Sequence, residues 1–307
     1  MKHVDVVIIG GGPAGISAAI WCERLGTDYL LLEKEAELGG QLPHIHNKII
    51  DYPGLHAKNG KEIQAIFETH FTELGCSRRL QAEVLTVNTN TKTVTIRPLG
   101  EIHFSYLIIA TGAAQRFLGV PGEKEMILRG ETYSATADSH LFEGKRVAVV
   151  GGGDRAFEGA ILLAEAGVKV FLIHRSHNFK AQKQYVDLVF SNKNIKIHTD
   201  LKLIRINGEE GVTSVELLNR DNEVLHLPVD AVLIRIGTKP NNEIVQDIVA
   251  FSEEGFIRTD SLGKTSNPFI YAIGDICTKP LFSSIASSVG QGAVVAKHLS
   301  SLIKQRK

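Results

Sequence analysis

Cysteine is scarce in this chain of 307 residues, which contains only Cys22, Cys76 and Cys277. The three are far apart in the sequence, so none forms a closely spaced pair. Cys22 and Cys76 fall on or beside predicted helices, as buried or incidental thiols usually do. Cys277 alone lies close to other candidate site residues, two positions after Asp275. Because a single cysteine cannot form a dithiol, the sequence predicts no dithiol centre.

An excess of charge of either sign is also missing. Lysine plus arginine and aspartate plus glutamate each number 34, so the formal net charge is zero. A balanced chain has no overall field that attracts nucleic acid or an anionic membrane, and a charged partner must dock locally. No apolar run approaches the length of about 20 residues that a membrane span needs. We expect a cytoplasmic protein without a nucleic-acid or membrane partner, and we predict no metal site.

Glycine, in contrast, is abundant and patterned. Two fingerprints, GGGPAG (10–15) and GGGDRA (151–156), each follow an apolar strand and open a helix. In such a fingerprint the first glycine permits the strand-to-helix turn, the second lets the backbone approach a pyrophosphate, and the third small residue allows close helix–strand packing. The pyrophosphate then lies at the helix N-terminus. Two fingerprints predict two bound dinucleotides.

The residues that end the second strand of each module differ in charge. Glu33 ends the first, and His174 followed by Arg175 ends the second at the same offset from the first glycine. A carboxylate there accepts hydrogen bonds from ribose hydroxyls, which suits the adenosine of FAD, whereas cationic or donor groups suit the 2′-phosphate of NADPH. A solvated acid at Glu33 and a surface base at Arg175 are the alternatives.

The rest of the pattern repeats a strand–helix plan in both modules, with turn-rich hairpin connectors at 88–92 and 219–222. Such alternation is typical of doubly wound α/β folds. The chain is long enough for two domains of roughly 100–200 residues each. The predicted helices are 14–25, about 60–75, 155–166 and 284–303, and the predicted strands include 28–33, 106–112, 146–150, 168–173, 231–237 and 269–275, with more short strands through 195–229.

The last strand and helix have no counterpart in the second module, so we expect them to complete the first domain. This predicts an α/β protein of two Rossmann-like domains, with parallel sheets and β-meanders in three layers, the second domain inserted in the first. The predicted FAD domain comprises 1–117 and 242–307, and the predicted NAD(P)H domain 118–241. Hinges are expected near 113–121 and 238–245.

The motifs together resemble the low-molecular-weight thioredoxin reductases over essentially the whole chain. Together with the two fingerprints, the motifs ELGGQL (37–42), DYPG (51–54), ATG (110–112), IRIGTKPN (234–241), AIGD (272–275) and KPL (279–281) stand in that family's order. The resemblance implies FAD and NADPH as cofactors and a homodimer. For FAD it implies the site residues Gly10, Gly12, Pro13, Ala14, Gly15, Glu33, Lys34, Gly40, Gln41, Leu42, Asp51, Val84, Ala110, Thr111, Gly112, Gly274, Asp275 and Ile285. For NADPH it implies Gly151, Gly153, Asp154, Arg155, Ala156, His174, Arg175, Lys180, Ile236 and Gly237.

One departure from that family concerns its redox dithiol. Where the family has Cys-Ala-Thr-Cys-Asp, this chain has Ser134-Ala135-Thr136-Ala137-Asp138. Disulfide exchange needs an attacking thiolate and a second thiol to resolve the mixed disulfide, and neither serine nor alanine supplies one. For Asp138, which follows the second cysteine in the family as a proton donor, a structural role in capping a turn is expected.

A second resemblance is to the thioredoxin-reductase-like ferredoxin/flavodoxin–NADP⁺ reductases, which lack the dithiol and pass electrons to a protein carrier. They stack an aromatic residue on the flavin, and His46 is the candidate here, with a solvated loop histidine as the alternative. In the phosphate clamp HRRxxxR of the thioredoxin reductases, this chain keeps His174 and Arg175, has Ser176, and offers Lys180 for the last arginine. Lysine lacks the bidentate fork of arginine, so the preference for NADPH over NADH is expected to be weaker.

The sequence thus predicts an FAD-dependent NAD(P)H oxidoreductase, similar to thioredoxin reductase but without its redox disulfide, that delivers electrons to an unknown acceptor other than thioredoxin. This acceptor is a small protein carrier or a small molecule. A ferredoxin/flavodoxin–NADP⁺ reductase in the strict sense is the alternative enzyme. A non-catalytic module that senses redox state through its nucleotides is the alternative from another class.

Overall fold

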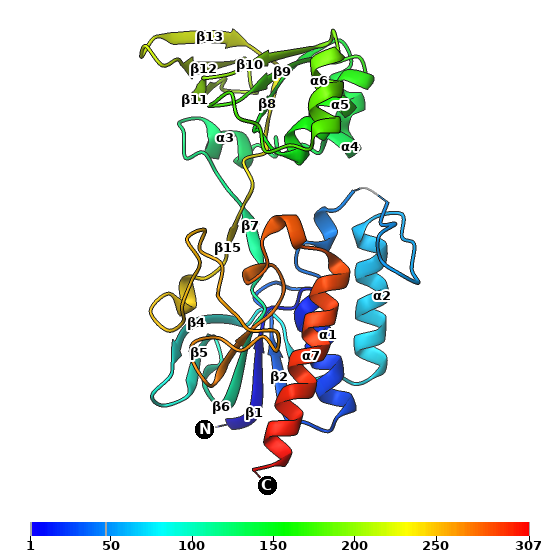
Figure 1. The fold of residues 1–307 in the computed structure, drawn as a ribbon, viewed down its shortest axis with the longest axis vertical. Coiled ribbons are helices and arrows are strands. Elements are labelled where there is room, and N and C mark those ends of the chain that lie inside the picture. Colours follow the sequence, from blue (N-terminus) through cyan, green and yellow to red (C-terminus); the bar gives the residue numbers. More distant parts are fainter. Residues whose placement is uncertain (1, 47, 307) are drawn as a thin grey trace. The chain divides into compact units, whose positions relative to one another are not determined.

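The structure is a computed structural model that describes residues 2–46 and 48–306. The chain divides into two compact units, Met1–Ala114 with Lys239–Lys307, and Gln115–Thr238. The second unit is thus inserted in the first, and the paired strands β7 (Ala113–Gln115) and β15 (Thr238–Pro240) run through the two connections. Both units have parallel strands and helices, which confirms the predicted α/β class with two Rossmann-like domains (Figure 1). Their assignment to FAD and to NAD(P)H stays a prediction.

The first unit is built on a sheet with the order β3-β2-β1-β6-β5-β4, in which β16 also pairs with β6. The pairs of β1 with β2 and β6, of β2 with β3 and of β6 with β16 are parallel, and the meander of β4, β5 and β6 is antiparallel. These strands span Lys2–Ile9 (β1), Tyr29–Leu32 (β2), Arg78–Arg79 (β3), Glu83–Asn88 (β4), Thr93–Arg97 (β5), Gly100–Ile109 (β6) and Ile270–Ala272 (β16).

Three helices cover one face of this sheet: α1 (Pro13–Arg24), α2 (Gly60–Glu73) and α7 (Ile285–Lys304). The helices α1 and α7 lie side by side, and a Cβ at Gly292 would come within 2.9 Å of the Ala18 nitrogen (Figure 1). Ser284 and Ser287 form a capping box at the start of α7, which satisfies backbone N–H groups that have no partner within the helix. This close packing holds the last helix against the first fingerprint helix.

The second unit has a four-stranded parallel sheet in the order β10-β9-β8-β14. A three-stranded meander packs on one face and two helices pack on the other. The strands of the sheet are β8 (Arg146–Val150), β9 (Lys169–Ile173), β10 (Ile195–His198) and β14 (Ala231–Ile234), and those of the meander are β11 (Lys202–Asn207), β12 (Ser214–Leu218) and β13 (Val224–Pro228). The helices are α3 (Glu123–Leu128), α4 (Ala135–Asp138), α5 (Asp154–Glu165) and α6 (Lys183–Ser191), of which α5 and α6 cover the sheet.

Three predicted strands end earlier than expected, and the one expected over 106–112 ends at Ile109. The strand expected over 269–275 ends at Ala272, because Gly274 has a positive φ of 78° and begins a 3₁₀ turn. The strand expected over 231–237 ends at Ile234, three residues before Gly237, whose φ is 89°. Both hairpin connectors are confirmed, since β4 and β5 flank 89–92 and β12 and β13 flank 219–223. Within 2–46 and 48–306, no helix has the length and apolar character needed to cross a bilayer.

Candidate dinucleotide-binding sites

The first fingerprint forms the turn that its glycine spacing predicts. Gly10 has a φ of 107°, and a Cβ there would overlap the carbonyl of Ala110, while a Cβ at Gly15 would overlap the carbonyl of Gly10. The helix α1 then begins at Pro13, and no side chain caps its start. An uncapped helix N-terminus behind a glycine turn is the feature that receives a pyrophosphate.

The predicted loop residues Gly40, Gln41 and Leu42 lie against this turn. The N–H of Gly39 donates to the carbonyl of Gly11 at 2.8 Å, and a Cβ at Gly40 would lie 3.1 Å from the Cα of Gly12. Gly40 also has a φ of 57°, in the left-handed region that favours glycine. Two backbones without side chains therefore form a cradle of the kind that lets a dinucleotide approach closely.

Glu33 is buried directly behind the fingerprint. Its Oε2 accepts the N–H of Gly11 at 2.6 Å, and its Oε1 accepts the N–H of Glu35 at 2.8 Å. The alternative of a solvated acid is therefore wrong. A carboxylate has about four lone-pair sites, so two acceptor positions are left for ribose hydroxyls.

Gln41 and Asp275, which are 234 positions apart in the sequence, meet in the first unit. The Nε2 of Gln41 donates to Oδ2 of Asp275 at 3.0 Å, and the hydroxyl of Ser283 donates to its Oδ1. Next to them the N–H of Gly274 donates to Oε1 of Gln291 at 2.6 Å. These polar groups lie where β16 ends, the edge at which parallel sheets bind ligands.

The other residues predicted for FAD differ in exposure and in what holds them. Lys34, Asp51 and His46 are exposed, whereas Val84 and Ala110 are buried in the sheet. Thr111 and Gly112 are held by Asn241: the Thr111 hydroxyl donates to its carbonyl at 2.7 Å, and the Asn241 N–H donates to the Gly112 carbonyl at 3.0 Å. The remaining residue, Ile285, begins α7 and packs on the cluster that contains Leu42.

The second fingerprint repeats the geometry of the first. Gly151 has a φ of 155°, and a Cβ there would overlap the carbonyl of Arg235 and lie 2.9 Å from the Cβ of Ala156. The helix α5 begins at Asp154 without a side-chain cap. Asp154 itself accepts the N–H of Gln182 at 2.7 Å and its Nε2 at 3.0 Å. The Asp154 carboxylate thus anchors the segment before α6, and its place beside NADPH stays a prediction.

His174 stands at the end of β9, where the sequence predicts cationic or donor groups, and it packs on the glycine turn. Its ring lies against Gly152, where a Cβ would come within 2.6 Å of Nδ1, and its Nε2 is 3.2 Å from the carbonyl of Asn178. Burial, and then the charge of Arg175, lower the pKa of this imidazole. A neutral ring that packs on the pyrophosphate turn positions the turn, and the positive charge comes from its neighbours.

Arg175, Lys180 and Arg155 are the exposed cations beside the second fingerprint. The backbone N–H of Lys180 donates to the carbonyl of Gly152 at 2.7 Å, which fixes the loop after β9 on the glycine turn. Ile236 and Gly237 follow β14 and complete this edge of the sheet. Sequence reasoning missed Arg235, although it stands inside the IRIG motif. Its guanidinium donates to the carbonyls of Tyr133 at 2.7 Å and Ile234 at 2.9 Å.

The segment that replaces the dithiol forms a reciprocal helix cap. The N–H of Ser134 donates to Oδ2 of Asp138 at 2.7 Å, and the N–H of Ala137 donates to the Ser134 hydroxyl at 3.4 Å. These bonds satisfy the free N–H groups at the start of α4. The predicted capping role of Asp138 is confirmed.

The three thiols are all protonated at neutral pH. Burial raises the pKa of Cys22 to about 12 and that of Cys277 to about 11, and it also raises the pKa of Cys76. The nucleophile in disulfide exchange is the thiolate, so these cysteines are poor candidates for that chemistry.

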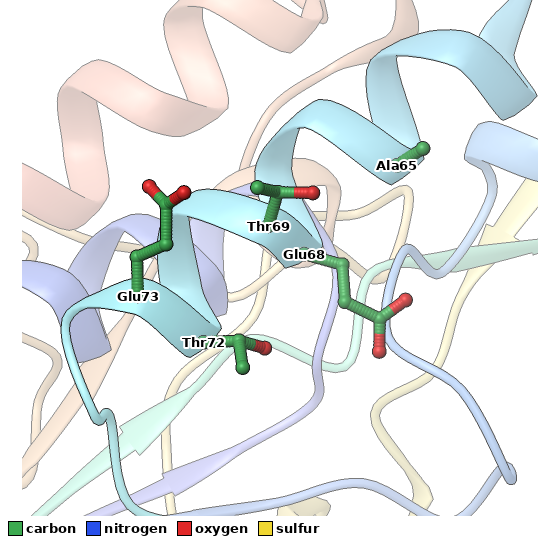
Figure 2. Close-up of a pocket in the computed structure, with 5 residues that line it drawn as sticks. All are labelled: Ala65, Glu68, Thr69, Thr72 and Glu73. Atoms are coloured by element: carbon green, nitrogen blue, oxygen red, sulfur yellow. The ribbon is translucent and has the colours of Figure 1, made fainter.

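Figure 2 shows a hollow on α2 that contains no residue of either fingerprint. Its lining residues all come from α2: Ala65, Glu68, Thr69, Thr72 and Glu73. A hollow that one helix lines by itself is open to solvent and has no converging groups from a second element. We assign no ligand to it.

Comparison with known proteins agrees with this geometry. The family of pyridine nucleotide-disulphide oxidoreductases matches residues 4–292. A thioredoxin reductase of Borreliella burgdorferi is 33% identical, with 98% of this chain and 92% of the relative covered. The 34.2 kDa protein in the rubredoxin operon of Clostridium pasteurianum is 31% identical, with 96% of each covered. The crystal structure of Lactococcus lactis thioredoxin reductase matches this structure with a TM-score of 0.83. The two sequences are 32% identical, and the match covers 98% of this chain and 99% of the Lactococcus lactis chain.

Two glycine turns on two Rossmann-like units, together with these matches, define a thioredoxin reductase-like, NAD(P)H-dependent flavoprotein oxidoreductase with FAD and NADPH as cofactors. The chain belongs to the pyridine nucleotide-disulphide oxidoreductase family.

Proposed function

We propose that this oxidoreductase passes electrons from NADPH through FAD to a small redox protein other than thioredoxin. The reciprocal helix cap supports this proposal. Ser134 and Ala137 stand at the positions that carry the dithiol in the thioredoxin reductases, and here both take part in hydrogen bonds of the cap. The buried, protonated cysteines leave no substitute nucleophile among the described residues.

In this proposal the first unit holds FAD through Glu33, Gly40 and the Gln41–Asp275 pair, and the second unit holds NADPH through its glycine turn, Arg175 and Lys180. When bound, NADPH supplies a hydride to the flavin, and the flavin supplies the acceptor with electrons, two for each NADPH. The protein binds and orients these groups, and no side chain is required as a nucleophile. His46 remains the candidate for stacking on the flavin.

Charge in the segment that follows Gln41 and Leu42 in the sequence favours a protein acceptor with an acidic surface. The segment 43–61 carries three lysines, Lys48, Lys58 and Lys61, and one acidic residue, Asp51. All four side chains are exposed. Complementary charge speeds the encounter of two proteins and orients them.

Exposed apolar side chains, in the same segment and just after Asp275, supply the other part of the proposed docking surface. Ile50 in the segment 43–61 is 73% exposed, and Leu281 and Phe282, just after Asp275, are 79% and 68% exposed. Apolar groups surrounded by charged ones are typical of transient interfaces. The Clostridium pasteurianum relative is a protein of a rubredoxin operon. Rubredoxin is therefore an acceptor to test, along with ferredoxin and flavodoxin.

Anaerobic mixing of the FAD-loaded protein with NADPH tests the enzyme against the redox sensor. We expect the flavin absorbance to bleach within seconds, whereas a sensor without turnover leaves it unchanged. Rubredoxin, ferredoxin, flavodoxin and thioredoxin are then each added with excess NADPH. We expect turnover of about 1 s⁻¹ or more with one of the first three and none with thioredoxin.

Thioredoxin turnover at that rate, persisting in Cys277→Ser, would contradict the proposal. Reduction of small quinones but of no protein carrier would contradict the protein acceptor. Lys48→Glu with Lys58→Glu separates docking from chemistry: reduction of the carrier is expected to slow, mainly at low ionic strength. Lys202→Glu in the second unit is the matched control, and reduction of the flavin by NADPH is expected to stay unchanged in both.

A further inference from the structure

A cluster of ionisable side chains gathers at the predicted adenosine end of the second dinucleotide fold. It combines His177 after β9, Asp200 after β10 and Arg220 in the turn between β12 and β13. The Nε2 of His177 contacts Oδ2 of Asp200, and Nη2 of Arg220 contacts its Oδ1. The Asp200 side chain is only 16% exposed, whereas the side chains of His177 and Arg220 are 66% and 69% exposed.

Backbone contacts place Asp200 beside the loop that starts with Arg175. The strands β9 and β10 are parallel with Ile173 opposite His198, so the residues two positions further along are Arg175 and Asp200. The N–H of Leu201 donates to the carbonyl of His174 at 3.2 Å, and the N–H of His174 to that of His198 at 2.8 Å. These bonds hold Asp200 next to the end of β9, where Figure 1 shows β9 and β10 side by side in one sheet.

The cluster has an excess of positive charge. Arg175 and Lys180 are exposed and have no ion-pair partner within 2–46 and 48–306, and the one carboxylate of Asp200 faces both His177 and Arg220. Position 176 is a serine, so Arg175 supplies the one guanidinium of the loop 174–180 after β9. A phosphate is bound more strongly by several guanidinium groups, each of which can donate two hydrogen bonds.

We propose that Arg220 is a specificity-determining residue that binds the 2′-phosphate of NADPH, and that Asp200 is the positioning residue that holds it there. This inference rests on the assignment of NADPH to the second unit and is independent of the acceptor. Arg220 comes from a hairpin remote in sequence and supplies the forked donor that Ser176 does not. The Asp200 carboxylate orients this side chain before the cofactor arrives, which reduces the entropy lost on binding.

Calorimetric titration of the FAD-loaded full chain with 2′,5′-ADP and with 5′-ADP tests this role without turnover. We expect Arg220→Ala to weaken 2′,5′-ADP binding by about 5- to 20-fold and 5′-ADP binding by less than about 2-fold, because a charge-assisted hydrogen bond to the phosphate is lost. Arg205→Ala is the matched control, since Arg205 on β11 of the same meander pairs with Glu216 at 3.6 Å. It is expected to change neither affinity.

Equal weakening of both ligands by Arg220→Ala, or no weakening of either, would overturn the role of Arg220. Failure of the unmodified protein to bind 2′,5′-ADP would overturn it together with the NADPH assignment. These titrations do not involve the electron acceptor. Failure to find a protein acceptor would therefore contradict the proposed function without affecting the proposed role of Arg220.

Asp200→Asn tests the positioning role. Asp200 has a φ of 58°, a left-handed conformation that asparagine adopts readily, so the backbone is expected to persist. Removal of a negative charge by itself strengthens binding of an anion. If Asp200 positions Arg220, the variant is instead expected to bind 2′,5′-ADP about 3-fold more weakly, with no added loss in the double variant with Arg220→Ala. Tighter binding by Asp200→Asn would overturn the positioning role.

Discussion

The two dinucleotide folds place opposite chemistry at one structural position. In the first unit the carboxylate of Glu33 lies behind the second glycine of its fingerprint and accepts the N–H of Gly11 at 2.6 Å. In the second unit the ring of His174 lies against Gly152, and its Nε2 is 3.2 Å from the carbonyl of Asn178 instead. Both side chains support a glycine turn, but only Glu33 does so through a hydrogen bond to the turn.

This difference separates support of the turn from recognition of the nucleotide. A buried carboxylate performs both tasks, since it bonds to the turn and keeps lone pairs for ribose hydroxyls. A neutral imidazole supports the turn by packing alone, so recognition passes to groups further out, such as Arg175 and, by our inference, Arg220. The second unit is therefore expected to tolerate changes at its supporting residue better than the first.

Substitution of Glu33 has the largest expected effect. Glu33→Ala leaves the N–H groups of Gly11 and Glu35 without their acceptor, and two such charge-assisted bonds contribute about 3–6 kcal/mol. We expect the variant to purify nearly free of flavin, measured by the ratio of flavin to protein absorbance, and to melt at lower temperature. His174→Ala is the counterpart and is expected to keep its FAD. A flavin-replete Glu33→Ala protein would remove the distinction between the units.

Substitution of Arg175 is expected to act on one cofactor alone. Arg175→Ala removes an exposed cation at the predicted 2′-phosphate site, and a charge-assisted phosphate contact is worth about 1.5–3 kcal/mol. The efficiency of flavin reduction by NADPH is expected to fall about 10- to 150-fold, with little change for NADH. Stopped-flow reduction with both cofactors measures this. Equal losses would assign Arg175 a structural role.

Acid is expected to weaken the second unit through its histidines. Burial lowers the pKa of His174, helped by Arg175, and that of His198, helped by Lys196. Below a pH of about 6.5, the ordinary histidine pKa, the unfolded chain therefore binds more protons than the folded one, and the free energy of unfolding falls. Each histidine contributes less than about 1.4 kcal/mol per pH unit, and solvent screening reduces this further. Above pH 7 no contribution is expected.

Urea unfolding between pH 7.5 and pH 5.5 measures this slope. His174→Gln is expected to flatten it, because one titrating ring is removed while a polar side chain of similar reach remains. An unchanged slope in this variant would indicate that acid acts through other groups.

Loss of the cap at the former dithiol turn has the smallest expected effect. Ser134→Ala removes the acceptor of the Ala137 N–H, and loss of an N-cap typically costs about 1 kcal/mol. Asp138→Ala is expected to cost a similar amount, whereas Thr136→Ala, with an exposed side chain on the same helix, is expected to be neutral. Thermal unfolding measures all three. A neutral Ser134→Ala would show that backbone contacts alone hold the turn.

Much of the fold and part of the candidate site could be predicted because their causes are local. The contact between Gly10 and Gly15 follows from a spacing of a few residues, and the hairpin at 88–92 follows from turn-forming side chains between two alternating strands. The role of Asp138 was predictable for the same reason, since its partner Ser134 is only four positions away. The helix α6 was missed, because no glycine or capping motif marks its start at Lys183.

Tertiary structure alone decides which distant residues meet. Gln41 and Asp275 are 234 positions apart and meet where β16, returning late in the chain, pairs with β6. Arg220 reaches Asp200 because the hairpin of β12 and β13 folds back on the end of β10. Packing of the half-buried His174 ring against Gly152 lowers its pKa, an effect that the residue type alone does not reveal. Glycine spacing thus predicts both nucleotide turns from short-range sterics, whereas charge states and long-range pairs depend on the burial and chain reversals of the folded molecule.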